Sequence, residues 1–120
     1  MPERPPAIQR LNSLLSAAMI AHEAIFEIRR KLIAADRVSP EQALLLQESA
    51  RIVTVELSGL SANARQLSTQ WSEQSVLDPE GAARTLAELE AELNRVKPRL
   101  LSLHKRQQEI ASQMRAMLEP

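Results

Sequence analysis

The apolar residues of this sequence recur in alternating steps of three and four along three long segments. In the first segment these positions are Leu11, Leu14, Ala18, Ala21, Ile25, Ile28, Leu32 and Ala35. In the second they are Ala43, Leu46, Ala50, Val53, Leu57, Leu60, Ala64, Leu67 and Trp71. In the third they are Leu86, Leu89, Leu93, Val96, Leu100, Leu103, Gln107, Ile110, Met114 and Met117, with Gln107 the one polar member. Such heptads predict three long helices packed along left-handed seams.

Helix-starting signals separate the segments. Ser39 is a suitable N-cap, Pro40 fits the first helical position, and Gln42 completes a capping box. Asp78 and Pro79 repeat the same device before the third segment. Because both connections are short, successive helices are expected to run antiparallel.

The predicted fold is therefore all-α, an antiparallel up-down-up three-helix bundle of coiled-coil-like helices. Pro98 falls inside the third segment but on the face opposite its seam, and the heptad phase continues across it, so we expect one long third helix with a kink there. The helices should span about 45 to 60 Å, which gives a rod. Residues 1–6 are expected to form a flexible proline-rich arm, and residues 7–120 a single domain. The heptads suit equally a closed bundle and an open hairpin completed by a second copy.

Composition excludes several classes of function. With 15 basic and 15 acidic side chains the formal net charge is zero, so no overall field draws the chain to nucleic acid or to an anionic membrane. The absence of cysteine excludes disulfides and thiolate chemistry and is compatible with the cytoplasm, where we expect the protein to act. No apolar run approaches the roughly 18 residues of a membrane-spanning helix.

The sequence offers no catalytic or metal-binding pattern. His22 and His104 are the only histidines, and neither lies in a HExxH or Glu-x-x-His arrangement. Two glycines 22 positions apart cannot build a phosphate-binding loop. We therefore expect no enzyme activity, no cofactor, no metal and no small-molecule substrate.

A second apolar stripe accompanies the seam of the first helix, and the second helix carries extra apolar residues near the same end of the rod. A helix with two apolar faces needs two neighbours. The bundle could supply both, but the third helix has charged residues on either side of its seam and covers a limited width. The candidate interface, for a partner protein or a second copy, consists of Leu15, Met19, Phe26, Ile33, Leu44, Leu45, Ile52, Val55 and Trp71.

Trp71 allows two interpretations. It ends the apolar series of the second helix, so it is expected to cap one end of the core, half buried. As the only tryptophan it could also be a docking anchor.

A basic cluster on the third helix gives an alternative function, nucleic-acid binding by an accessory subunit of a nucleoprotein complex. Its members are Arg95, Lys97, Arg99, Lys105 and Arg106. Stacking aromatics are missing, and the acidic first half of the same helix would repel phosphate. A solvated face of ion pairs is the simpler explanation of the cluster.

In length and in its alternating Leu, Ala, Gln and Arg helices, the chain is similar to the small all-helical export chaperones of flagellar and type III secretion systems. The resemblance covers architecture alone. Together these features predict a non-enzymatic structural, adaptor or chaperone-like protein that acts through helix–helix contacts.

Overall fold

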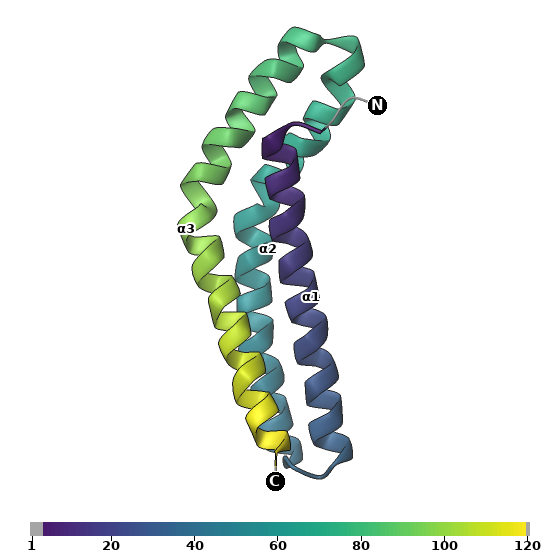
Figure 1. The fold of residues 1–120 in the computed structure, drawn as a ribbon, viewed down its shortest axis with the longest axis vertical. Coiled ribbons are helices and arrows are strands. Elements are labelled where there is room, and N and C mark those ends of the chain that lie inside the picture. Colours follow the sequence, from purple (N-terminus) through teal and green to yellow (C-terminus); the bar gives the residue numbers. More distant parts are fainter. Residues whose placement is uncertain (1–3, 120) are drawn as a thin grey trace.

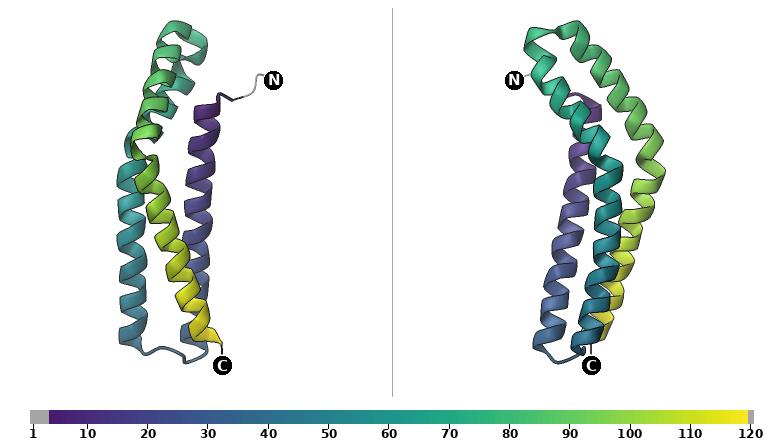
Figure 2. Two further views of the ribbon diagram at one scale, coloured as in Figure 1. Left: turned by 60° about the vertical axis from the view of Figure 1, so that its left-hand side comes forward. Right: turned by 180° about the vertical axis from the view of Figure 1, so that it is seen from behind.

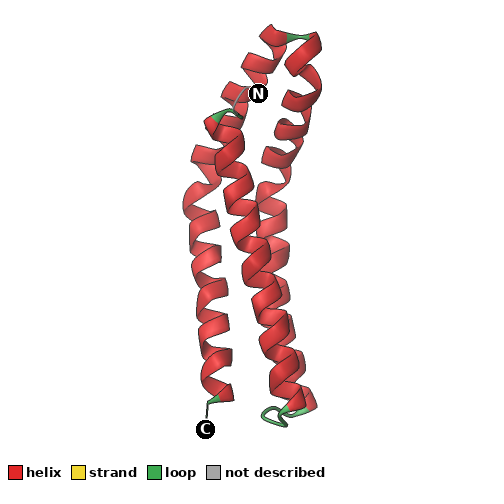
Figure 3. Cartoon of the chain, turned by 45° about the vertical axis from the view of Figure 1, so that its right-hand side comes forward, coloured by secondary structure: helices red, strands yellow, loops and turns green. Residues whose placement is uncertain are grey.

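The computed structural model describes residues 4–119 and consists of three long helices. Helix α1 covers Pro6–Ala34, α2 covers Pro40–Leu77 and α3 covers Pro79–Leu118. Successive helices run antiparallel, with α1 running down, α2 up and α3 down in Figure 1, in one bundle with extents of 58 × 28 × 18 Å. Within the described residues, loop is confined to the chain ends and the two turns (Figure 3). The predicted all-α three-helix rod is confirmed.

The heptad positions form the core, in two clusters. A lower cluster around Leu32, Val53 and Met114 fills the end that holds the first turn. An upper cluster around Leu11 and Leu89 packs the start of α1 between α2 and α3. Gln107, the polar heptad position, is buried, and its Nε2 donates to the Ala18 carbonyl at 3.3 Å. Because Gln107 is hydrogen-bonded, it does not leave an unpaired polar group in the core.

The turn between α1 and α2 contains the predicted capping box at the start of α2 and a Schellman motif at the end of α1 that was not predicted. The capping box is present, with Gln42 N donating to Ser39 Oγ at 3.1 Å and Ser39 N to Gln42 Oε1 at 2.8 Å. Before it, α1 ends in a Schellman motif, in which the Arg37 amide donates to Leu32 O and Asp36 adopts φ 54°. Asp tolerates this left-handed conformation better than most residues. Ala35, expected to be the last residue of the α1 seam, is instead the exposed C-cap.

The turn between α2 and α3 depends on Asp78 and Gly81. The Gly81 amide donates to Asp78 Oδ1 at 3.0 Å, as expected for an N-cap. A Cβ on Gly81 would lie 2.1 Å from Asp78 Oδ2, so only glycine fits against the capping carboxylate in this arrangement. One turn further on, Thr85 Oγ1 donates to Gln74 Oε1 at 2.6 Å and links the two helices.

Two prolines lie within the helices. Pro98 is exposed inside α3, which stays one continuous helix and bends at mid-length (Figure 1), as expected. Pro6 was assigned to the flexible arm but is the first residue of α1, because the first helical position needs no amide donor. Of the rest of that arm, residues 1–3 lie outside the described part of the chain, so its flexibility stays a prediction.

Helix α1 is shorter than its neighbours, and the α2–α3 hairpin extends past its first turn (Figure 2). Trp71 lies near this point, half buried against the upper cluster that includes Ile8. The expectation that Trp71 caps the end of the shared core is met, and beyond it the α2–α3 hairpin extends past the start of α1 (Figure 2).

Candidate protein-binding site

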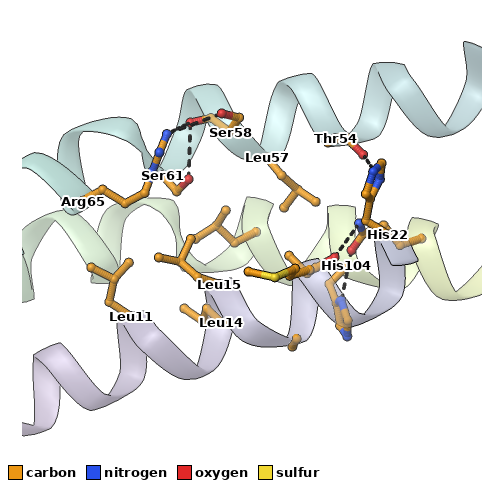
Figure 4. A pocket seen from close by; sticks show the side chains of 15 residues that line it. Leu11, Leu14, Leu15, His22, Thr54, Leu57, Ser58, Ser61, Arg65 and His104 are labelled. Atoms are coloured by element: carbon orange, nitrogen blue, oxygen red, sulfur yellow. Dashed lines mark hydrogen bonds between the residues drawn. The ribbon is translucent and has the colours of Figure 1, made fainter. Parts of the chain in front are cut away.

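A recess opens between α1 and α2. Helix α1 packs more extensively against α3 than against α2. The resulting recess has a volume of about 380 Å³, with walls from α1 and α2 and with α3 behind them (Figure 4). Leu15 and Leu57 face it from opposite walls, and Leu100 of α3 contributes to its lining. The bundle is thus tightly packed along α3 and open between its first two helices.

The short polar side chains of α2 explain why this side stays open. Thr54, Ser58, Ser61 and Arg65 follow one another at steps of four, three and four, and all four line the recess. The Thr54 hydroxyl donates to Ala50 O at 3.0 Å, and that of Ser61 to Ser58 O at 3.3 Å. These hydroxyls bond to their own helix and are too short to fill the space in front of α1.

Two polar contacts join α1 to α2. The first lies at the end of the recess, and the second lies nearer the first turn. His22 Nδ1 lies 3.2 Å from Thr54 Oγ1, and Arg29 Nη1 donates to Gln47 Oε1 at 2.8 Å. Since the Thr54 hydroxyl already donates to Ala50, His22 must be the donor in its contact. These bonds fix the spacing of the helices without covering the apolar side chains around them.

Seven of the candidate interface residues are exposed, on α1 and around the outer face of α2, where Leu45 and Ile52 lie on the flank that also carries Asn63 and turns toward α3. On α1 they recur every seven residues and so follow one stripe. On α2 they form two neighbouring lines. Leu45 and Ile52 are seven residues apart in one, and Leu44 and Val55 are eleven residues apart in the other. With their exposed fractions they are Met19 (60%), Phe26 (54%), Ile33 (49%), Leu44 (65%), Leu45 (69%), Ile52 (56%) and Val55 (57%). We call these seven residues the apolar surface.

The two remaining candidates are placed differently. Leu15 is half buried and lines the recess, and Trp71 is half buried beside the upper cluster. The sequence analysis omitted further exposed apolar residues: Ile20 on α1, Leu101 on α3, and Val76 and Leu77 next to the second turn. Heptad counting finds the seams but says little about apolar residues outside them.

The basic cluster of α3 is largely neutralised. Arg99 bonds to Glu56 of α2 at 2.5 Å, Arg95 pairs with Glu92, and Arg106 lies 3.6 Å from Glu109. Within residues 4–119 only Lys97 and Lys105 of the cluster lack an ion pair, and this weakens the nucleic-acid alternative.

Two carboxyl groups have a lowered pKa. Hydrogen bonds from Arg95 and from Asn63 Nδ2, the latter at 2.8 Å, favour the charged form of Glu92 and lower its pKa. The hydrogen bond from Arg51 lowers the pKa of Glu48 in the same way. Glu92 joins α2 to α3, whereas Glu48 and Arg51 both belong to α2 and neutralise each other beside the apolar surface.

Neither a metal site nor a membrane span is found in the described part of the chain. Residues 4–119 contain no group of three or more His, Asp or Glu side chains placed to hold a metal ion. None of the described helices has a stretch both long and apolar enough to cross a bilayer.

Comparisons with protein-family models, with curated proteins and with solved structures found no match to this chain. The recess and the apolar surface are the features of the molecule that point to a function.

The sequence analysis missed the recess and the role of Arg65 in lining it. A signal was present, because Thr54, Ser58, Ser61 and Arg65 form a heptad-spaced polar line beside the apolar seam of α2. A helix flank with short side chains leaves space against a neighbour, whereas a flank of leucines would close it.

Proposed function

We propose that the chain is a protein-binding adaptor that acts through the apolar surface and the recess between α1 and α2. The observation that carries this proposal is the gathering of exposed apolar side chains on two adjacent helices. The seven side chains are between 49% and 69% exposed, and contiguous apolar patches above a few hundred Å² are rare on soluble monomers. A standard protein interface buries about 800 Å² on each partner.

Two ion pairs on the exposed faces of α1 and α2 cancel their own charges. Glu27 pairs with Arg30 at 3.0 Å on α1, and Glu48 with Arg51 at 2.5 Å on α2. A partner that covers such i,i+3 pairs meets no net charge from them, so burial of the neighbouring apolar side chains is less strongly opposed.

Glutamate substitutions at two exposed sites test the proposal. Phe26→Glu and Leu45→Glu each place a charge within the apolar surface and should reduce capture of the partner protein at least tenfold, with little change in folding. The measurement is a pull-down of the tagged protein from lysate of its own source, with and without nuclease, read by mass spectrometry. Light scattering of the purified protein reports self-association.

Leu101→Glu is the matched control, because Leu101 is 47% exposed but belongs to α3. It should retain every partner. Equal capture by all three variants would contradict the proposal. Partners that disappear only on nuclease treatment would favour the nucleoprotein alternative.

A further inference from the structure

Two arginines on the α1–α2 side, Arg29 and Arg65, form hydrogen bonds only to uncharged groups. Arg65 Nη2 donates to Ser58 O at 3.1 Å and to Ser58 Oγ at 3.4 Å. Arg29 donates to the Gln47 amide, and its guanidinium lies 5.9 Å from the centre of the Phe26 ring. Within residues 4–119 neither forms an ion pair, whereas Arg30, Arg51, Arg95, Arg99 and Arg106 all do. Arg37 and Arg84 likewise form no ion pair within these residues, but Arg29 and Arg65 are the two that lie on the open side.

The space around these guanidiniums is mainly apolar. Arg65 is the one permanently charged side chain that lines the recess, and no carboxylate does so. Arg29 and Asp36 both line a hollow below the recess, without forming an ion pair with each other. A ligand that fits this surface must supply apolar side chains in the middle and a negative charge toward each arginine.

The distance between the two positive points is set by α2. Gln47, which binds Arg29, and Arg65 are 18 residues apart in one helix, about 27 Å at 1.5 Å per residue. Eighteen residues are also five whole turns, so positions i and i+18 of a second helix lie on one face.

Backbone geometry restricts the form of the ligand. On this side the described chain offers helices and no sheet edge, and backbone groups inside helices are already paired. An extended peptide would find no backbone partners here, whereas an amphipathic helix pairs its own backbone and docks through side chains. A helix laid in the opening would complete a four-helix arrangement.

We propose that the α1–α2 side binds an amphipathic helix of another protein, whose apolar stripe is flanked by two acidic residues about 18 positions apart. One acidic residue meets Arg29 and the other meets Arg65. A second copy of this chain is a poorer fit, because it presents the same two unpaired guanidiniums. The inference rests on the proposed adaptor function and specifies the partner.

Designed peptides test the pairing of charges. The first probe is a helical peptide of about 25 residues with a Leu/Ala heptad stripe and Glu at two flanking positions 18 apart. The second is the same peptide with Lys at those two positions. Calorimetric titration into the full chain should show the Glu peptide binding at least tenfold more tightly, with the difference shrinking at high salt.

A charge-swapped protein makes the test specific. The double variant Arg29→Glu/Arg65→Glu should prefer the Lys peptide. The control, Arg84→Glu/Lys105→Glu, makes the same change of charge at exposed sites on α3 and should keep the preference for the Glu peptide. Circular dichroism of each variant verifies its helix content.

Several results would overturn the inference: equal affinity for both peptides, an unchanged preference in the swapped protein, or no binding of either peptide. A dimer in light scattering that Phe26→Glu dissociates would assign the surface to a second copy instead. In that case the protein would still act by protein–protein contact, but with a second copy as its partner. If Phe26→Glu behaves like the wild type in the pull-down, the titration and light scattering, the adaptor function itself is rejected.

Discussion

The two sides of α2 use their polar side chains differently. Toward α3, Glu56 bonds to Arg99 and Asn63 bonds to Glu92, so charged groups of one helix are matched by the other. Toward α1, the positive Arg29 meets only the neutral Gln47. The charged groups between α2 and α3 are thus matched within one chain, whereas Arg29 bonds across to α2 through an uncharged amide. Apolar side chains remain exposed on the outer faces of both α1 and α2.

The largest expected effect contrasts a leucine of the packed core with one of the apolar surface. Leu89 is fully buried in α3, and Leu45 is 69% exposed on α2. Leu89→Ala should lower the free energy of unfolding by about 2 to 5 kcal/mol. Leu45→Ala should change it by less than about 0.5 kcal/mol. Urea unfolding followed by circular dichroism measures both, and comparable losses would mean that Leu45 is covered in solution.

A smaller effect is expected from removing the bend in α3. Pro98 is exposed and lacks the amide that a helix interior uses, so Pro98→Ala should raise the free energy of unfolding by about 1 to 2 kcal/mol. Thermal unfolding provides the measurement, with Lys97→Ala next to it as a control for the loss of surface side chains. A decrease in stability would show that the bend keeps α3 seated against both neighbours.

The smallest expected effect is a pH dependence of the α2–α3 side. The pKa of Glu92 is lowered in the folded protein, so its ion pair and hydrogen bond contribute stability above the ordinary glutamate pKa of about 4.3. That contribution is lost as the pH falls through the lowered value. Between pH 6 and pH 3 the wild-type protein should therefore lose more stability than Glu92→Gln, by less than about 1 kcal/mol.

Glu90→Gln, which removes an exposed carboxylate two positions away, is the control and should follow the wild-type pH profile. If Glu92→Gln also follows that profile, the ionised Glu92 adds nothing to stability through either Arg95 or Asn63.

The sequence predicted most of the fold because heptads and caps act locally. The seam of each helix, and the starts of α2 and α3, could be located from residue spacing alone. The left-handed Asp36 was not foreseen, since the position is usually glycine and Asp has no unique signature there.

The candidate site was predicted less completely. Spacing placed Met19, Phe26 and Ile33 on one stripe, and they are exposed as expected. For the recess, spacing gives only the polar line on α2, because the opening also depends on the unequal packing of α1 against α2 and α3. Likewise the neutralisation of Arg99 depends on Glu56, 43 residues away in the chain, and no local pattern connects the two.

The position of Trp71 gives the protein a built-in optical probe. The chain has one tryptophan and no tyrosine, so its ultraviolet fluorescence comes almost wholly from the point where α1 begins against the α2–α3 hairpin. Far-ultraviolet dichroism, in contrast, reports all three helices at once. Fraying of the first turns of α1 would red-shift the emission while most of the helix signal remained, so detachment of this end can be followed separately from global unfolding, without any label.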